Sequence, residues 1–437
     1  MGTNNIHTAR GLALEIVGEI LGQSAYSNIA LNKWLSSSKL SAKDKGLVTE
    51  LVYGTISHKI TLEWYLSHFV ADREKLEPWV YYLLMLSLYQ LLYLDKIPQH
   101  ALVNEAVNLA KDGRGTEKLV NAILRSILRE GLPDPNTIKR KNKCLSVCYS
   151  IPIWLVQMLN KEYGEERAEK IFASLQFRNK ASVRVTDRIH LTDLKEELGA
   201  ELSPLSPVAL VKNSGHFAGS QAFKEGRIAI QDETSQLVAP TLNLQGHEYV
   251  LDACAAPGGK TCHIASYLTT GNVLALDLYD HKLALIEENA RRLGLEERIN
   301  TKRLDATKIA TEFGEEQFDA VLVDAPCSGI GLIRRKPDIR YNKDIMDSDS
   351  LSSVQLKILD SVCQTVKKGG IITYSTCTII AKENQEVIHK FLVNHPNFEQ
   401  VRLQHSCEDI MVDGCLLITP EQYRTDGFFI SQLRRIS

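Results

Sequence analysis

The chain of 437 residues lacks the long apolar run that a membrane-spanning helix needs. Its longest apolar run, from Trp79 to Leu94, covers only 16 residues and is interrupted by Ser87 and Gln90, so it predicts a buried helix. The residues after Met1 also lack the basic and then apolar pattern of a secretory signal peptide. These absences predict a cytoplasmic protein without a membrane partner.

Cysteine is sparse, and neither sign of charge dominates. The nine cysteines are an odd number spread thinly over the chain, which predicts free thiols in a reducing cytoplasm. Cys144 and Cys148 have C-x3-C spacing, but no second ligand pair lies nearby, so we predict no metal site. The formal net charge of −2 gives the whole chain no signature of nucleic-acid binding, although a local basic patch is compatible with this balance.

The composition that remains is that of a globular protein with two or three domains, because 437 residues exceed one ordinary core. Apolar residues recur at helical spacing from Ala9 to Leu21 and from Val120 to Leu128, which predicts an all-helical domain over residues 1–135. Residues 136–150 contain the basic run Lys139–Lys143 and predict a linker. The basic run fits a solvated linker at least as well as an RNA contact.

The pattern changes again after this break. Residues 151–227 contain a helix from Trp154 to about residue 175 and then strand-like alternation, which indicate a small α+β unit. From residue 228 to residue 437, strands alternate with amphipathic stretches, which predicts the α/β class with a doubly wound, mostly parallel, Rossmann-like sheet. The strand candidates are Tyr249–Asp252, Val273–Asp277, Thr301–Asp305, Phe318–Asp324 and Gly370–Ser375.

Four of these strand candidates end in an aspartate, namely Asp252, Asp277, Asp305 and Asp324. Sheets of this class bind ligands beyond the carboxyl ends of their strands, so the four carboxylates are expected to line one crevice. A single aspartate at such a place more often caps a turn or a helix, but an ordered series of four favours a binding site. Asp277 can accept hydrogen bonds from both ribose hydroxyls of an adenosine, and Asp305 would lie near the adenine.

The first strand runs into the turn Asp252-Ala-Cys-Ala-Ala-Pro-Gly-Gly-Lys-Thr, whose glycines allow the backbone to approach a ligand closely. The end of this turn resembles a phosphate-binding P-loop. That motif requires a glycine five positions before Gly259, and this position is Cys254. The turn does not match G-x-G-x-x-G either. A nucleoside triphosphate and a dinucleotide are therefore disfavoured.

Two cysteines follow the fourth and fifth strands: Cys327 in Asp324-Ala-Pro-Cys-Ser-Gly and Cys377 in Tyr374-Ser-Thr-Cys-Thr. A lone cysteine is most often a small buried hydrophobe, but two at neighbouring strand ends on the ligand-binding edge indicate chemistry. A structural disulfide does not suit a cytosolic enzyme. The P-C-x-x-C motif of zinc deaminases is excluded because position 330 is isoleucine.

Three of these segments resemble the motifs of the NOL1/NOP2/Sun family of RNA cytosine-5 methyltransferases, namely Asp252–Lys260, Asp324–Cys327 and Ser375–Cys377. The helical N-terminus, with Pro98–Val107 and Val120–Arg125, resembles the RNA-binding protein NusB. This fusion is the architecture of a bacterial ribosomal RNA methyltransferase, and the resemblance covers nearly the whole chain. Thr378 departs from the serine expected there but keeps the hydroxyl.

The resemblance implies an enzyme that depends on S-adenosylmethionine and methylates carbon 5 of a cytosine in small-subunit ribosomal RNA. It implies that the nucleophile is Cys377, that Cys327 serves product release, and that Asp324 contacts the cytosine and also the cofactor. The implied cofactor-binding residues are Cys254, Ala255, Ala256, Pro257, Gly258, Gly259, Lys260, Asp277, Asp305 and Asp324. We expect a monomer that binds RNA and no DNA, and a target base that leaves its stack.

Three alternatives stay open at this point. A related methyltransferase that acts on transfer RNA differs only in its substrate. A non-catalytic NusB-like RNA-binding factor would be expected to have decayed cofactor motifs, and here they are intact. A small-molecule methyltransferase would need neither an extra helical domain nor two cysteines. The segment Arg334–Lys336 could contact phosphates, and a solvated basic loop is an equally good interpretation.

Overall fold

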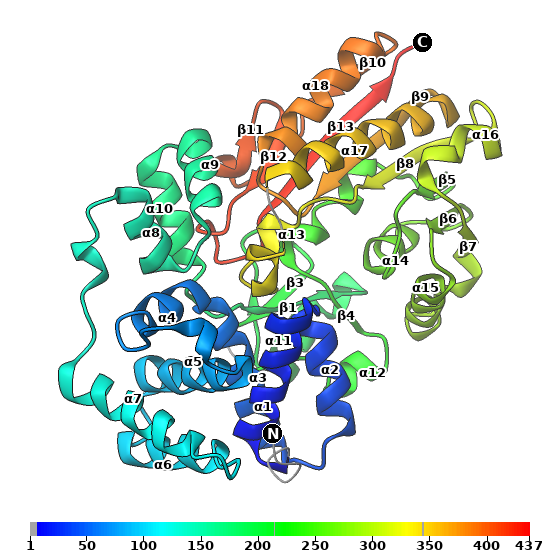
Figure 1. Cartoon of the computed structure of the whole chain (residues 1–437). Coiled ribbons are helices and arrows are strands. Elements are labelled where there is room, and N and C mark those ends of the chain that lie inside the picture. The colour runs from blue at the N-terminus through cyan, green and yellow to red at the C-terminus, as the bar shows by residue number, and fades with distance from the viewer. Residues whose placement is uncertain (1–6, 214, 343–344) are drawn as a thin grey trace. The chain divides into compact units, whose positions relative to one another are not determined.

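The computed structural model describes residues 7–213, 215–342 and 345–437 and divides the chain into two compact units. The first unit contains the residues up to Gln176 together with the segment Lys336–Lys343. The second contains Phe177–Arg335 and Asp344–Ser437. Figure 1 shows the elements of both units in chain order. Over the described ranges, no helix combines the length and the apolarity that crossing a membrane requires.

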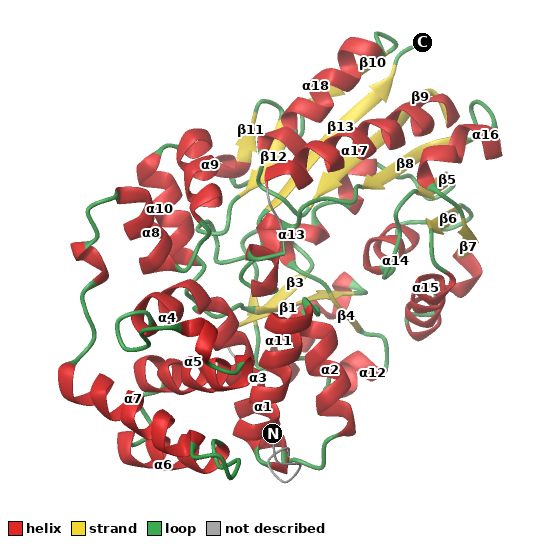
Figure 2. Ribbon diagram, in the orientation of Figure 1, coloured by secondary structure: helices red, strands yellow, loops and turns green. Residues whose placement is uncertain are grey.

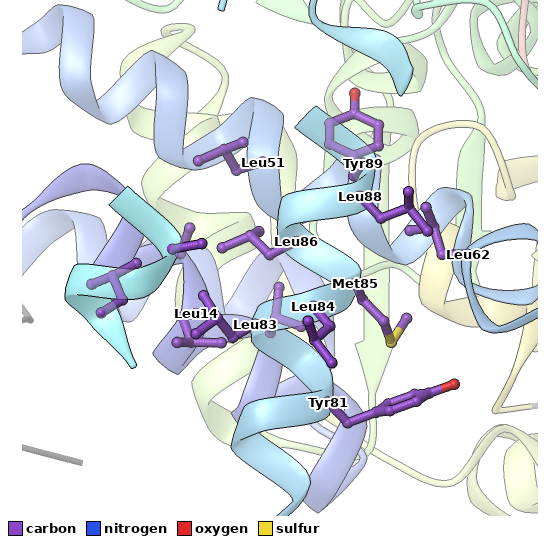
Figure 3. Close-up of a cluster of buried hydrophobic side chains, with 14 of the residues drawn as sticks. Leu14, Leu51, Leu62, Tyr81, Leu83, Leu84, Met85, Leu86, Leu88 and Tyr89 are labelled. Carbon is purple, nitrogen blue, oxygen red and sulfur yellow. The ribbon is translucent and has the colours of Figure 1, made fainter. Parts of the chain in front are cut away.

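The first unit is helical. Helix α5 is central to its core because α5 is apolar on all sides, and every residue from Leu83 to Gln90 is buried. Figure 3 shows side chains of α5 pointing in different directions, with Leu51 of α3 and Leu62 of α4 on different sides of it. The helices are α1 (Ala9–Gln23), α2 (Ser27–Ser37), α3 (Ala42–Ser57), α4 (Lys59–Leu66), α5 (Pro78–Tyr93), α6 (Gln99–Leu109), α7 (Thr116–Glu130), α8 (Lys141–Tyr149), α9 (Ile153–Tyr163) and α10 (Glu165–Ser174).

A short segment from the C-terminal half of the sequence completes the helical unit. Its Arg340 is fully buried and donates through Nη1 to the carbonyl of Ser57, at 2.8 Å, and to that of Ser150, at 3.0 Å. Ser57 is the last residue of α3, and Ser150 caps α8. The carbonyl ends of helices carry partial negative charge, so two helix termini stabilise this buried guanidinium.

The second unit begins with a small antiparallel sheet in the order β2-β3-β1-β4. Helices α11 (Leu191–Leu198) and α12 (Gln221–Lys224) accompany it. Leucine, valine and phenylalanine side chains from its strands and helices form a separate apolar cluster. The strands are β1 (Ala181–Val185), β2 (Glu201–Leu202), β3 (Ala209–Lys212) and β4 (Ile228–Ile230).

A large sheet forms the rest of the second unit, in the order β11-β12-β13-β9-β8-β5-β6-β7 with β10 beside β13. The neighbours from β7 to β9 are parallel, and β13 is antiparallel to β9 (Figure 2). Its strands are β5 (Tyr249–Asp252), β6 (Asn272–Asp277), β7 (Ile299–Arg303), β8 (Phe318–Asp324), β9 (Val366–Thr376), β10 (Phe398–Val401), β11 (Met411–Val412), β12 (Cys415–Ile418) and β13 (Phe428–Arg435). Its helices are α13 (Glu233–Gln236), α14 (Gly259–Ala265), α15 (Asp280–Arg292), α16 (Ile309–Phe313), α17 (Ile345–Thr365) and α18 (Gln385–Asn394).

The predicted fold class is confirmed: a helical N-terminal region precedes a Rossmann-like sheet. Three local predictions differ from the structure. The expected linker contains helix α8, whose Leu145 and Val147 are buried. The single helix expected after residue 151 is interrupted at Gly164, whose φ of 77° is left-handed and ends α9. The third parallel strand ends at Arg303, so Asp305 lies beyond the strand and caps the short turn that follows it.

Two glycines of α3 make the packing of this helix testable. A Cβ atom on Gly54 would lie 1.9 Å from Cζ of the buried Tyr89, whereas one on Gly46 would meet no atom within 4 Å. We therefore expect Gly54→Ala to lower the free energy of unfolding of the helical unit by about 1–3 kcal/mol through overpacking. Gly46→Ala should raise it by up to about 1 kcal/mol, because alanine is the better helix former. Urea unfolding monitored by circular dichroism measures the free energy of unfolding of both variants. Equal effects of the two substitutions would contradict the close contact between Gly54 and Tyr89.

Candidate active site

The candidate site lies where the strand order reverses, between β5 and β8. The chain continues from β5 to β6 and β7 on one side, while β8 and β9 lie on the other side. Ligands bind at this topological switch point in open α/β sheets, beyond the carboxyl ends of the strands. The turn after β5, Asp324 at the end of β8 and Cys377 just after β9 are therefore at one edge of the sheet.

The two cysteines selected from the sequence lie together. Their Sγ atoms are 3.1 Å apart, although 50 positions separate Cys327 from Cys377. All nine cysteines of the chain are free thiols, as the sequence predicts. The contact with Cys377 and burial hold the pKa of the Cys327 thiol well above its usual range. Cys327 therefore keeps its proton and can donate it in a hydrogen bond to the neighbouring sulfur.

Asp324 connects this thiol pair with the turn after β5. Its Oδ1 accepts a hydrogen bond of 2.7 Å from the hydroxyl of Ser375, and its Oδ2 accepts one of 2.7 Å from Nζ of Lys260. Burial alone would lower the pKa of Lys260, but the carboxylate of Asp324 raises it above its ordinary value, so this lysine is charged. Lys260, which the motif resemblance implies for the cofactor site, thus has its ammonium on the carboxylate beside the thiols.

A buried glutamate that sequence reasoning missed holds the segment after Cys327. Glu383 is fully buried and accepts a hydrogen bond of 2.8 Å from the backbone N–H of Ser328. The hydroxyl of Ser328 donates to that of Thr378 at 2.9 Å, so the threonine that departs from the expected serine uses its hydroxyl here. Nε2 of Gln355 donates to the carbonyl of Pro326 at 2.9 Å. No motif contains Glu383 or Gln355, so the sequence offered no signal for either.

Two glycines permit the close approach of these segments. The backbone N–H of Gly331 donates to the carbonyl of Cys377 at 3.0 Å, and its carbonyl accepts from the N–H of Gly427 at 2.9 Å. A Cβ atom on Gly331 would lie 2.1 Å from the carbonyl oxygen of Gly427. No side chain fits at this position, so a glycine there is a requirement of the thiol geometry.

The turn between β5 and α14 is built so that its backbone faces outward. Gly258 has a φ of 97°, and a Cβ atom there would lie 3.0 Å from Cα of Ile286. Asp252 lies beneath the turn and accepts a hydrogen bond of 2.7 Å from the hydroxyl of Thr261. Complete burial raises the pKa of Asp252 to about 7. Burial likewise raises the pKa of Cys254, which makes this residue a neutral thiol and a poor nucleophile.

The structure allows a test of whether these residues fit an adenosine cofactor. Asp277 ends β6, and its Oδ1 accepts from the backbone N–H of Tyr279 at 3.2 Å, which orients the carboxylate. A Cβ atom on Gly259, at the start of α14, would meet no atom within 4 Å, so the backbone is open there. A carboxylate beside an open glycine turn fits a ribose. Asp305 accepts from the N–H and the hydroxyl of Thr307, and these bonds lower the pKa of Asp305, so one of its oxygens serves the turn.

The basic residues after Cys327 are not a solvated loop. Arg334 is buried and donates through Nη1 to the carbonyl of Thr425 at 3.2 Å. Arg335 donates to Asp426 at 3.0 Å and to Asp232 at 2.8 Å. These guanidinium groups tie the segment after Cys327 to the segment before β13. Within the described parts of the chain, no group of three or more His, Cys, Asp or Glu residues could hold a metal ion.

Family models match both parts of the chain. A model described as 16S rRNA methyltransferase RsmB/F matches residues 239–434, and the NusB family model matches residues 7–129. The chain is 44% identical to the probable ribosomal RNA small subunit methyltransferase B of Bacillus subtilis, over 98% of this chain and 99% of that protein. It is 31% identical to ribosomal RNA small subunit methyltransferase B of Shewanella oneidensis, over 97% of this chain and 98% of that protein.

Solved structures agree with this relationship. The crystal structure of PH0851 superposes with a TM-score of 0.82 at 27% identity, covering 98% of this chain and 99% of that one. NSun6 from Pyrococcus horikoshii with SFG superposes with a TM-score of 0.57 over 65% of this chain, and its 21% identity shows a common fold alone. The resemblance found in the motifs is thereby confirmed. The chain belongs to the ribosomal RNA small subunit methyltransferase B family, whose members depend on S-adenosylmethionine and join a NusB domain to a Rossmann-like catalytic domain.

Proposed function

We propose that the protein transfers a methyl group to carbon 5 of a cytosine in small-subunit ribosomal RNA through a covalent bond between Cys377 and carbon 6. The observation that carries the proposal is the pair of thiols 3.1 Å apart, next to a carboxylate that a lysine contacts. Carbon 5 of cytosine is too weak a nucleophile to take a methyl group from a sulfonium directly. A thiolate added to carbon 6 turns the ring into an enamine with electron density on carbon 5.

Cys377 is the nucleophile in this proposal. Its thiol must first lose its proton to water, because the thiolate and not the thiol adds to carbon 6. The neighbouring Cys327 is suited to stabilise that thiolate, since its raised pKa keeps it protonated and able to donate a hydrogen bond over 3.1 Å.

Cys327 acts later, when the product is released. Once Cys377 is bonded to carbon 6 as a thioether, its hydrogen bond with Cys327 is weakened, and that bond is the largest cause of the raised pKa of Cys327. Cys327 then loses its own proton to water and accepts the proton of carbon 5. The electron pair of that C–H bond restores the double bond between carbons 5 and 6, and Cys377 leaves as a thiolate.

Asp324 and Lys260 orient the cytosine. The carboxylate of Asp324 is fixed by Ser375 on one oxygen and by Lys260 on the other, so its remaining lone pairs have a defined direction. They can accept hydrogen bonds from the exocyclic amine of the base. The ammonium of Lys260 is close enough to balance negative charge that develops on the ring during thiol addition.

Asp277 and the turn of residues 254–260 are the proposed cofactor site. S-adenosylmethionine supplies a methyl group on a positively charged sulfur when bound. Asp277 accepts the ribose hydroxyls, the open backbone at Gly259 allows close approach, and Asp305 reaches the adenine through the oxygen that does not cap its turn. The carboxylate of Asp324 contributes negative potential beside the sulfonium.

The proposal also covers the substrate, the oligomeric state and the cellular location of the enzyme. We expect the enzyme to act as a monomer in the cytoplasm, on RNA and not on DNA, with the NusB-like helices contributing to RNA binding. A non-catalytic RNA-binding factor would not need a pair of neighbouring thiols or an intact nucleoside turn. An enzyme specific for transfer RNA is disfavoured, because the matched family model is described by its 16S ribosomal RNA activity.

Substitution of each cysteine tests the separate roles of the two thiols. Cys377→Ala should give neither a covalent adduct nor methylation, because the nucleophile is absent. Cys327→Ala keeps the nucleophile but impairs release, so RNA should stay attached and form a slow, nuclease-sensitive band on a denaturing gel. The double variant should behave like Cys377→Ala, since attack comes first. A band from Cys377→Ala and none from Cys327→Ala would reverse the two roles.

Substitution of Asp277 tests the proposed cofactor site. Asp277→Ala should weaken S-adenosylmethionine binding by about 1.5–3 kcal/mol, because two charge-assisted hydrogen bonds are lost. The matched control is Asp280→Ala, since the Asp280 side chain is 73% exposed and pairs with Arg303 at the surface. Isothermal titration calorimetry measures both affinities. Equal affinity of the two variants would remove Asp277 from the cofactor site.

A further inference from the structure

An exposed aromatic ring and an exposed guanidinium lie together in the catalytic unit, outside the residues used above. Phe177 precedes β1 and is 57% exposed. Cζ of Arg424 lies 5.5 Å from the centre of the Phe177 ring. Both residues belong to the second unit although 247 positions separate them. We call this pair the Phe177–Arg424 platform.

The backbone that presents Arg424 is strained. Tyr423 and Arg424 have φ values of 54° and 52°, so two successive residues with side chains adopt the left-handed conformation. Such residues persist only where the surroundings hold them, and they concentrate at functional sites. Here the hydroxyl of Tyr423 donates to Asp409 at 2.5 Å, and the hydroxyl of Thr425 donates to Asp232 at 2.9 Å. The fold therefore maintains this strained turn from both sides.

The platform is connected to the thiol pair by a short backbone path. Three residues after Arg424, Gly427 donates to the carbonyl of Gly331, and Gly331 donates to the carbonyl of Cys377. Successive Cα atoms are about 3.8 Å apart, so the whole path places Arg424 within roughly 20 Å of Cys377. A few nucleotides of single-stranded RNA span this distance. A strand whose target cytosine is at the thiols can therefore reach the platform with a flanking base.

The chemistry of the platform fits an unpaired nucleobase. Proteins recognise single-stranded RNA by stacking its bases on aromatic rings and on planar guanidinium groups, while cationic side chains attract the phosphates. Arg424 supplies a cation at the ring, and the residue that follows Phe177, Arg178, is also exposed. This cationic and aromatic combination is complementary to a base with its phosphate.

We propose that the Phe177–Arg424 platform stacks one unpaired base that flanks the target cytosine in the RNA substrate. The ring of Phe177 provides the stacking face, and Arg424 lies over that ring or pairs with the adjoining phosphate. The platform would select a target whose neighbouring nucleotides are single-stranded. This inference rests on an RNA substrate, as the family has, and not on which atom of the base is methylated.

The test uses the full-length protein and two RNA probes. The first probe is unmodified small-subunit ribosomal RNA made by transcription. The second is a synthetic oligonucleotide around the methylated cytosine, whose position is found by bisulfite sequencing of the reacted ribosomal RNA. It is prepared in six further versions, each with a single abasic residue at one of the three positions on either side of that cytosine. Equilibrium binding is measured for the wild type, Phe177→Leu and Phe177→Tyr. The matched control is Ile189→Ala, because Ile189 of the same unit is 83% exposed and has no arginine partner assigned above.

Phe177→Leu should weaken binding of both probes by about tenfold, while Phe177→Tyr and Ile189→Ala stay within about twofold of the wild type. The deficit of Phe177→Leu should vanish on the oligonucleotide whose abasic residue removes the stacked base. Unchanged binding by Phe177→Leu, or a deficit that is the same on every abasic probe, overturns the proposal. If the reaction yields no 5-methylcytosine, the proposed function fails and the oligonucleotide cannot be designed. The affinities of Phe177→Leu and Phe177→Tyr for the transcribed RNA then still show whether an aromatic ring at position 177 is needed for binding.

Discussion

The site depends on one constraint of the sheet, which is that β8 and β9 are parallel neighbours in register. Asp324 of β8 pairs with Ser375 of β9, so the residues that follow each strand emerge at the same edge. This register brings together two thiols from distant parts of the chain and gives Asp324 the hydroxyl of Ser375 as a partner. A shift of one residue in this pairing would turn the side chains to opposite faces and separate these groups.

Electrostatics then distribute protons and charges around the thiols. Lys260 comes from the helix after β5 and keeps its charge in a buried place because Asp324 is beside it. The pair joins the nucleoside turn to the thiol segments through an ion pair that is only partly exposed to water. The neutral thiol of Cys327 complements this arrangement, since it can donate a hydrogen bond to the neighbouring sulfur. In our proposal the same charges orient the cytosine and support the thiolate.

The sequence predicted the fold well because its signals were local. Apolar periodicity revealed α1, α5 and α7, and β5 and β8 have the bounds expected from their apolar runs before aspartates. The motifs also selected both cysteines and Asp324, which lie together.

The features that the sequence did not predict depend on partners that are distant along the chain. Arg334 and Arg335 have the sequence pattern of a basic surface, but Arg334 is buried and both donate to carbonyl or carboxylate oxygens. Arg340 completes a helical unit far away in sequence, and Glu383 has no motif around it.

The central claim is that catalysis passes through a bond between Cys377 and carbon 6 of cytosine. RNA containing 5-fluorocytidine tests it most directly, because fluorine at carbon 5 replaces the proton that must leave before release. After reaction of the wild-type enzyme with this RNA and S-adenosylmethionine, digestion and mass spectrometry should find a methylated fluorocytidine on the peptide that contains Cys377. A modified peptide containing Cys327 instead, or methylated RNA without any attached peptide, would contradict the account.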